Sequence, residues 1–256
     1  MMNFKYYVLL LCFTFLASCS ENITDLENRI KIQAEKNDRE MSASEIKETA
    51  SSLIAWGKQD FYQKEIEKFK AADKQLSPDL ESILFIGSSS IRFWKTLKQD
   101  VSPYKIINRG FGGAHISHVN YHFDEIVKPH SPKAIVFFCG TNDIAALKSV
   151  EEVYGDFLDF YSRAKESFPD IKVFVIGIKP SLARLYLQKE ELNYNAKIKS
   201  LSVQDSNLFF IDVWDAMLTE EGSPNPELFI GDGLHINSQG YAIWTKLLMP
   251  ILEENL

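Results

Sequence analysis

Serine, histidine, aspartate and asparagine side chains stand at the ends of apolar runs in this chain, where they could form a hydrolytic site. They belong to the clusters Gly87-Ser88-Ser89-Ser90, Gly140-Thr141-Asn142-Asp143 and Asp232-Gly233-Leu234-His235. A hydroxyl nucleophile needs an imidazole base, the imidazole needs a carboxylate to orient it, and a developing oxyanion needs N–H donors already in place. These four roles could be taken by Ser89, His235, Asp232 and Asn142.

The aspartate and histidine of the last cluster are the most specific signal. A carboxylate three residues before an imidazole, in a glycine-containing loop, can reach Nδ1 and leave Nε2 facing the serine. The serine cluster alone is weaker evidence, because serines after a strand also serve as turn residues and helix caps. We assign Asp143 a structural role, either capping the next helix or pinning the loop.

With the segment Asn108-Arg109-Gly110-Phe111-Gly112-Gly113, the clusters resemble in order and spacing the conserved blocks of the GDSL/SGNH hydrolase family. The resemblance covers residues 83–252 and includes the strand, Gly-x-Ser and helix start of platelet-activating-factor acetylhydrolase catalytic subunits. It implies that Ser89 is the nucleophile and that the oxyanion hole consists of the N–H groups of Ser89 and Gly113 with the Asn142 amide. Ser88 stands where the family usually has aspartate, which concerns how the loop is held.

The resemblance implies no cofactor, and the remaining histidines do not indicate a metal. His118 and His122 could share a helix face, but no cysteine joins them and the pattern His-Glu-x-x-His is absent. We therefore expect these two residues and His115 to pack on a half-buried helix face. Cys139 follows an apolar run and is expected to be a small buried side chain rather than a nucleophile.

Three further side chains could line a substrate cleft. Arg92 and Trp94 come shortly after the nucleophile, and Lys179 follows an apolar run. Each could equally be a surface or packing residue, and both interpretations stay open.

Short apolar runs alternate along the chain with segments of helical period, and these segments hold the candidate residues in place. We expect strands at 83–86, 105–108, 134–139, 172–178 and 208–212, and helices at 61–72, 116–127, 150–167, 185–203 and 238–252, the last with Ser238 as N-cap. Continuous apolar strands separated by helices predict a parallel sheet covered on both faces. We therefore expect the α/β class, with a three-layer α/β/α flavodoxin-like fold and a five-stranded parallel sheet. The resemblance to SGNH hydrolases implies the same fold. Ligands bind beyond the carboxyl ends of such strands.

The length of 256 residues suits one catalytic domain, and the net charge of −7 argues against nucleic acid as a partner. We expect a signal peptide at 1–18, a lipid-anchored polar tether at 19–58 and the hydrolase domain at 59–256. The segment Leu16-Ala17-Ser18-Cys19 resembles a bacterial lipobox, so Cys19 is expected to carry lipid and hold the chain on a membrane of the bacterial cell envelope, on its periplasmic or surface side. An ordinary signal peptide is the alternative.

The expected function is a serine ester hydrolase acting on short acyl esters, foremost acetyl esters, of carbohydrates or other polar alcohols. Ser89 would attack the carbonyl, His235 would move the proton and Asp232 would orient the ring, giving an acyl-enzyme that water releases. The short-acyl expectation rests on the 53 positions from Ser89 to Asn142, which two strand–helix units consume without room for a lid. Two alternatives are a non-catalytic envelope protein that binds a glycan or an anion and an acyltransferase using the same serine.

Overall fold

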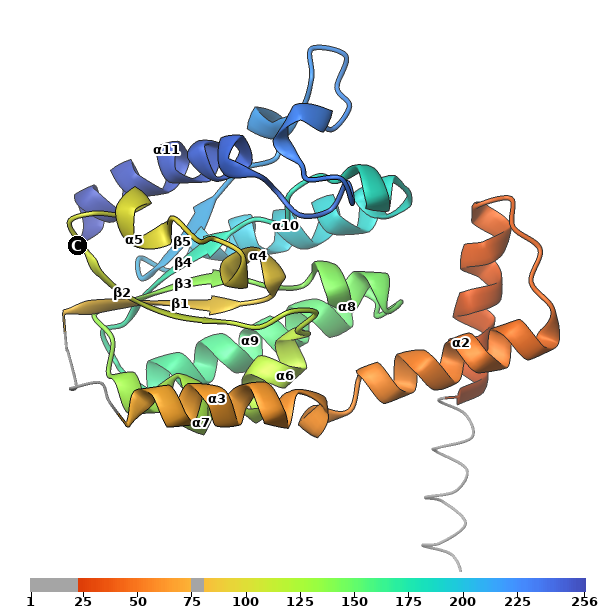
Figure 1. Cartoon of the computed structure of the whole chain (residues 1–256), viewed down its shortest axis with the longest axis horizontal. Helices are drawn as coiled ribbons and strands as arrows, with labels where there is room; N and C mark the ends of the chain where they lie inside the picture. Colours follow the sequence, from red (N-terminus) through yellow and green to blue (C-terminus); the bar gives the residue numbers. More distant parts are fainter. Residues whose placement is uncertain (1–22, 75–80) are drawn as a thin grey trace, which may run out of the picture. The chain divides into compact units, whose positions relative to one another are not determined.

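The computed structural model describes residues 23–74 and 81–256 and divides the chain into two compact units, Met1–Lys58 and Gln59–Leu256 (Figure 1). The expected signal peptide and Cys19 lie outside the described residues. In the first unit the predicted tether is helical, at 23–36 and in α2 (Ala43–Trp56). Ser42 begins α2 with a capping box, because its hydroxyl accepts from the Glu45 N–H and the Glu45 carboxylate accepts from the Ser42 N–H.

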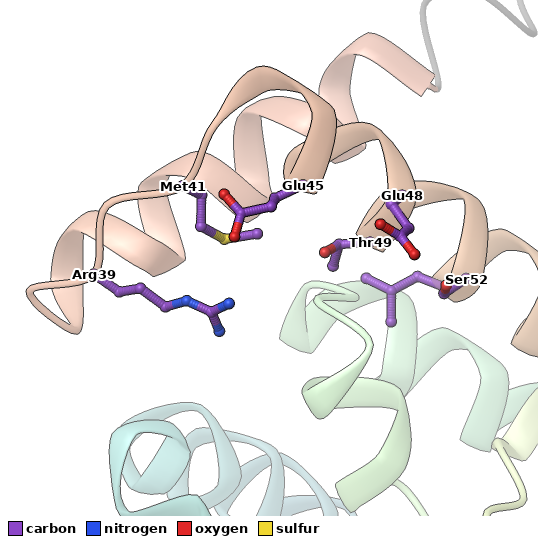
Figure 2. A pocket seen from close by; sticks show the side chains of 7 residues that line it. Arg39, Met41, Glu45, Glu48, Thr49 and Ser52 are labelled. Atoms are coloured by element: carbon purple, nitrogen blue, oxygen red, sulfur yellow. The ribbon is translucent and has the colours of Figure 1, made fainter.

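The first unit also has a hollow of about 360 Å³ along α2 and the loop that precedes it (Figure 2). It is lined by mostly polar side chains from α2 and the preceding loop: Arg39, Met41, Glu45, Glu48, Thr49, Ser52 and Leu53. Throughout residues 23–74 and 81–256, no helix combines the length and the hydropathy that a membrane crossing requires.

The second unit is built on a five-stranded parallel sheet, which confirms the predicted fold class. The strands follow the order β2-β1-β3-β4-β5 and comprise β1 (Ser82–Gly87), β2 (Lys105–Gly110), β3 (Ala134–Phe138), β4 (Lys172–Ile176) and β5 (Leu208–Ile211). The neighbouring interior strands β1 and β3 are buried along their whole length, as their continuous apolar sequences require. All five strands end at the same edge, which is where the polar clusters follow them.

Helices cover both faces of this sheet (Figure 1). One apolar core packs beneath α3 (Gln63–Asp73), α6 (Ile116–Tyr121), α7 (Phe123–Ile126), α9 (Val150–Ser167) and α10 (Gln188–Ser202), and the other beneath α4 (Ser89–Arg92), α5 (Leu97–Asp100) and α11 (Ser238–Asn255). Alternate residues of β1 divide between them, since Leu84 belongs to the first core and Phe85 to the second. Shorter helical segments are η1 (Gln59–Tyr62), η2 (Lys128–His130), α8 (Thr141–Ala145), η3 (Leu182–Leu187), η4 (Asp215–Met217) and η5 (Pro226–Leu228).

The N-cap predicted for the last helix is wrong by one residue. Asn237, and not Ser238, precedes the first turn of α11 in an extended conformation, and its side-chain oxygen accepts from the N–H groups of the second and third helical residues. Asparagine at this place satisfies two backbone donors that Ser238, already inside the helix, cannot reach.

Two helix predictions also need correction. The helix expected at 116–127 is broken at His122, whose backbone (φ −93°, ψ 11°) ends α6 and precedes α7. The helix expected at 185–203 begins at Gln188, because the preceding residues form η3, in which Arg184 leaves the helical region with φ −130° and ψ 32°.

Candidate active site

A continuous chain of hydrogen bonds joins Ser89, His235 and Asp232 at the carboxyl edge of the sheet. His235 Nε2 lies 2.8 Å from Ser89 Oγ, and His235 Nδ1 lies 2.6 Å from Asp232 Oδ2. Since an ionised carboxylate only accepts, Nδ1 carries the hydrogen and Nε2 is left to accept the serine proton. The arrangement matches a nucleophile, a general base and an orienting carboxylate.

The loop that carries Asp232 and His235 fixes the Asp232 carboxylate through its own backbone N–H groups. Asp232 Oδ1 accepts from the backbone N–H groups of Leu234 and His235, each at 2.9 Å. Although partial burial acts in the opposite direction, these bonds and the one from the His235 ring lower the pKa of Asp232 to about 2. The carboxylate is therefore ionised at neutral pH, and the histidine tautomer is set by it.

A sharp turn at the end of β1 presents the serine. Gly87 has φ +139°, and a Cβ built there would stand 1.9 Å from the backbone oxygen of Phe138, the last residue of β3. Because glycine has no Cβ, the chain can approach β3 closely enough for the Ser88 N–H to donate to the same oxygen at 3.0 Å. The chain then turns directly into α4. Ser88 and Ser90 are buried while Ser89, the first residue of α4, is partly exposed.

Two loops carry the predicted oxyanion donors next to this turn. The loop after β2 contains Gly113 (φ +76°), and its Phe111 N–H donates to the oxygen of Gly87 at 3.0 Å. Asn142, in the first turn of α8, donates through Nδ2 to the oxygen of Ala114 at 3.1 Å and is nearly fully buried. The Gly113 loop is thus bonded on one side to the turn that carries Ser89 and on the other to Asn142.

Of the three predicted cleft residues, Trp94 does not line a cleft. It is 2% exposed, its Nε1 donates to Asp100 Oδ2 at 2.6 Å, and its ring stacks on Tyr241. The interpretation as a packing residue is the correct one, because α4 turns this side of the chain onto the core beneath α11.

Lys179 and Arg92 differ in their surroundings. Lys179 is buried and donates to the oxygen of Leu234 at 2.5 Å, so it supports the loop of Asp232 and His235 from within the protein. Burial lowers the pKa of Lys179 to about 8, against the nearby Glu191 carboxylate. Arg92 has a half-exposed side chain 3.9 Å from Glu65 and remains a candidate cleft residue.

Several residues of this region were not singled out from the sequence. Phe93 is 40% exposed, and its ring meets the His235 ring edge to face at a centroid distance of 4.9 Å. Arg184 donates to Thr141 Oγ1 and to Asn142 Oδ1, and Thr141 donates to Glu191. No local pattern marks these residues, since Phe93 stands beside another aromatic and Arg184 is more than forty positions from its partners.

The residues assigned to structural roles occupy them. Asp143 is fully buried, accepts from the Ile116 N–H at 3.2 Å and pairs with Lys148 at 2.8 Å, so it pins its loop as expected. Cys139 is buried, and burial raises the pKa of its thiol. His115, His118 and His122 are fully buried rather than half-buried as predicted, and the rings of His115 and His118 stack on each other with centroids 4.8 Å apart. Among the residues that the structure describes, no group of three or more His, Cys, Asp or Glu side chains could hold a metal ion.

Residues 87–243 match the model of the GDSL-like Lipase/Acylhydrolase family, a span that contains every residue of the hydrogen-bonded chain above. Three solved structures share the fold. A candidate platelet activating factor from Streptococcus pneumonia has 21% identity and a TM-score of 0.67, covering 83% of this chain and 100% of that one. A GDSL-like lipase from Bacteroides thetaiotaomicron has 21% identity and a TM-score of 0.65, covering 75% and 98%. A mutant of an acetyl-xylooligosaccharide esterase from Geobacillus Stearmophilus has 16% identity and a TM-score of 0.55, covering 66% and 93%. No curated protein matches.

Proposed function

Because the chain belongs to the GDSL-like lipase/acylhydrolase family and is a carboxylic ester hydrolase, we propose that it cleaves short acyl esters, foremost acetyl esters, of carbohydrates or other polar alcohols. The observation that carries the catalytic assignment is the hydrogen-bonded chain from Ser89 Oγ through His235 to Asp232. Ser89 is assigned as the nucleophile, His235 as the general base and Asp232 as the residue that orients it.

In the proposed reaction Ser89 Oγ attacks the acyl carbonyl while His235 Nε2 takes its proton. The resulting oxyanion is held by the N–H groups of Ser89 and Gly113 with the Asn142 amide. Collapse of the tetrahedral intermediate breaks the bond to the alcohol, which leaves with the proton from His235. Water, activated by the same histidine, then attacks the acyl-enzyme and releases the acid and the free serine.

The preference for short acyl groups follows from how open the site is. The side chain of His235 is 20% exposed and that of Asp232 44%, and the chain between Ser89 and Asn142 is taken up by the elements from α4 to β3. A longer acyl chain gains affinity only if its methylenes are buried, at about 0.8 kcal/mol each. Phe93 and Ile230, exposed apolar residues beside His235, suit a sugar face or a short acyl group. An acetyl-xylooligosaccharide esterase with the same fold supports a carbohydrate ester.

The substrate proposal is tested by kcat/KM across nitrophenyl esters from acetate to decanoate, together with acetylated xylooligosaccharides. We expect kcat/KM to be highest between acetate and butyrate and to fall with each longer acyl group. The Ser89→Ala variant is the control and should hydrolyse none of them above the buffer rate. A rise in kcat/KM through decanoate would contradict the short-acyl proposal and favour a lipase.

We also propose that Cys19 carries the lipid that holds the enzyme in the bacterial cell envelope, because the segment 16–19 resembles a lipobox. The Cys19→Ser variant should leave the membrane fraction while its specific activity stays unchanged, since the catalytic unit begins at Gln59. Membrane fractionation with an ester assay measures both quantities. Retention of Cys19→Ser in the membrane fraction would remove the lipid anchor from the proposal.

A further inference from the structure

Arg184 contacts the candidate oxyanion donor although it lies outside the catalytic clusters. Its guanidinium donates through Nη1 to Thr141 Oγ1 at 2.7 Å and through Nη2 to Asn142 Oδ1 at 3.0 Å. The two acceptors are consecutive residues of α8, so the planar guanidinium binds the start of this helix through both Nη1 and Nη2.

These contacts settle the orientation of the Asn142 amide. A guanidinium has donors only, so the atom that faces Arg184 must be the carbonyl oxygen Oδ1 and the amino group must point the other way. That amino group gives one hydrogen to the oxygen of Ala114 at 3.1 Å, in the loop of Gly113. The second hydrogen of Nδ2 stays available for a developing oxyanion. Hydrogen bonding of Oδ1 to a cation also polarises the amide and makes its N–H groups stronger donors.

A buried carboxylate completes the arrangement. Thr141 donates its hydroxyl hydrogen to Glu191 Oε1 at 2.8 Å, which leaves the lone pairs of Oγ1 for Arg184. Glu191 lies on α10 and is fully buried, and in its ionised form its charge attracts that of Arg184. The hydrogen bonds therefore run in one direction, from Arg184 to Thr141 and from Thr141 to Glu191. Thr141 and Glu191 hold the arginine in place independently of its bond to Asn142.

The segment that carries Arg184 also contacts the catalytic loop. The N–H of Ala183, its neighbour in η3, donates to the oxygen of Gly233 at 3.1 Å. Gly233 lies between Asp232 and His235, with φ +64°. One short segment thus touches both the loop of the general base and the side chain of the oxyanion donor.

We propose that Arg184 is a positioning residue that holds the Asn142 amide with its N–H group directed at the oxyanion. The proposal rests on the proposed function, in which Asn142 stabilises the tetrahedral intermediate. Arg184 acts through Asn142 and does not itself contact the reacting atoms, so its contribution exists only while the amide is present.

A double-mutant cycle with Arg184→Met and Asn142→Ala tests this, with kcat and KM measured on nitrophenyl acetate. Loss of a charge-assisted hydrogen bond predicts that Arg184→Met lowers kcat by about 10- to 100-fold with KM changed by less than about 3-fold. In the Asn142→Ala background the same substitution should lower kcat by less than about 2-fold. Equal losses in both backgrounds would overturn the proposal, because Arg184 would then act independently of Asn142.

The control variant is Arg163→Met, which removes another partly buried arginine that donates to a backbone oxygen, that of Asn120, and lies over the Phe123 ring. It should leave kcat unchanged. If Arg184→Met does not fold, Arg184→Lys replaces it in the cycle, since one ammonium group cannot reproduce the two-ended contact. A near-normal kcat in Asn142→Ala would refute the oxyanion assignment itself. A large loss in Asn142→Ala with none in Arg184→Met would refute only the positioning role.

Discussion

At the scale of single residues, burial separates the three consecutive serines after β1. Ser88 and Ser90 are 1% and 5% exposed, and the Ser88 hydroxyl has no hydrogen-bond partner among the described residues. Ser89 is partly exposed and contacts His235 Nε2 at 2.8 Å. Only Ser89 combines access to a substrate with a base that can take its proton.

We therefore predict that a fluorophosphonate probe forms its adduct on Ser89 alone, because a base within hydrogen-bond reach activates only this hydroxyl. Peptide mass spectrometry of the labelled protein identifies the site. Ser89→Ala should be unlabelled, whereas Ser90→Ala should still react. An adduct on Ser88 or Ser90 would contradict the assignment of the nucleophile.

A second prediction at this scale concerns Phe93, whose ring packs edge to face against the His235 ring and should help to hold it in place. An aromatic pair of this kind contributes about 0.5–1.5 kcal/mol, so Phe93→Ala should lower kcat/KM by roughly 2- to 10-fold. Steady-state kinetics on an acetyl ester measures the loss. Phe61→Ala, which removes another exposed phenylalanine, 52% accessible on η1, should leave kcat/KM unchanged. Equal effects of the two substitutions would show that Phe93 has no special part in the site.

At the scale of elements, strand ends and loops hold the site through backbone contacts. The end of β1 approaches the end of β3 so closely that Gly87 has no room for a side chain. The loop after β2 bonds to Gly87 through Phe111, and Tyr241 of α11 donates to the oxygen of Ser90 at 2.8 Å. The turn formed by Gly87 to Ser90 at the end of β1 is thus anchored to β3, to the loop after β2 and to α11.

Gly87→Ala should accordingly destabilise the protein by more than about 4 kcal/mol or prevent folding, because the new Cβ would overlap backbone atoms of Phe138. Urea unfolding measures the change. Gly155→Ala is the matched control: this glycine lies within α9 with nothing within 4 Å of the added Cβ. It should stabilise the protein by about 0.5–1 kcal/mol. A native-like midpoint for Gly87→Ala would show that the two strand ends can separate at little cost.

At the scale of the whole molecule, charges are buried behind the site. Burial raises the pKa of Glu191 to about 7, against the hydrogen bond from Thr141 and the charges of Lys179 and Arg184. Burial likewise raises the pKa of Asp143 to about 6, against Lys148. Both carboxyl groups lose their protons more readily in the unfolded chain than in the folded one. Between the two pKa values of each group the folded state binds more protons, so its stability falls as pH rises.

We predict that Glu191→Gln reduces the loss of stability between pH 4.5, the ordinary pKa of a glutamate, and about 7. Glutamine keeps an oxygen for the Thr141 hydroxyl but removes the titration, while Asp143 still contributes at the lower end of the range. Urea unfolding across this pH range measures the slope. Glu253→Gln, on the exposed surface of α11, should leave the slope unchanged. An unaltered slope in Glu191→Gln would exclude Glu191 as its source.

Features that depend on neighbouring residues could be predicted from the amino-acid sequence alone. Each predicted strand begins within one residue of the observed one, because a continuous apolar run between turn residues has few other structures open to it. Parallel strands then place their carboxyl ends at one edge, which brings the clusters of Ser89 and His235 together although 146 positions separate them.

The packing of whole elements determines which side chains face the site, and this could not be predicted from the sequence. Phe93 and Trp94 are adjacent aromatic residues, and the way α4 packs on the sheet exposes the first and buries the second. Arg184 reaches Asn142 because η3, which follows β4 in the chain, packs against α8. Burial and contacts between distant segments depend on how whole elements pack, and no local pattern of residue types encodes that packing.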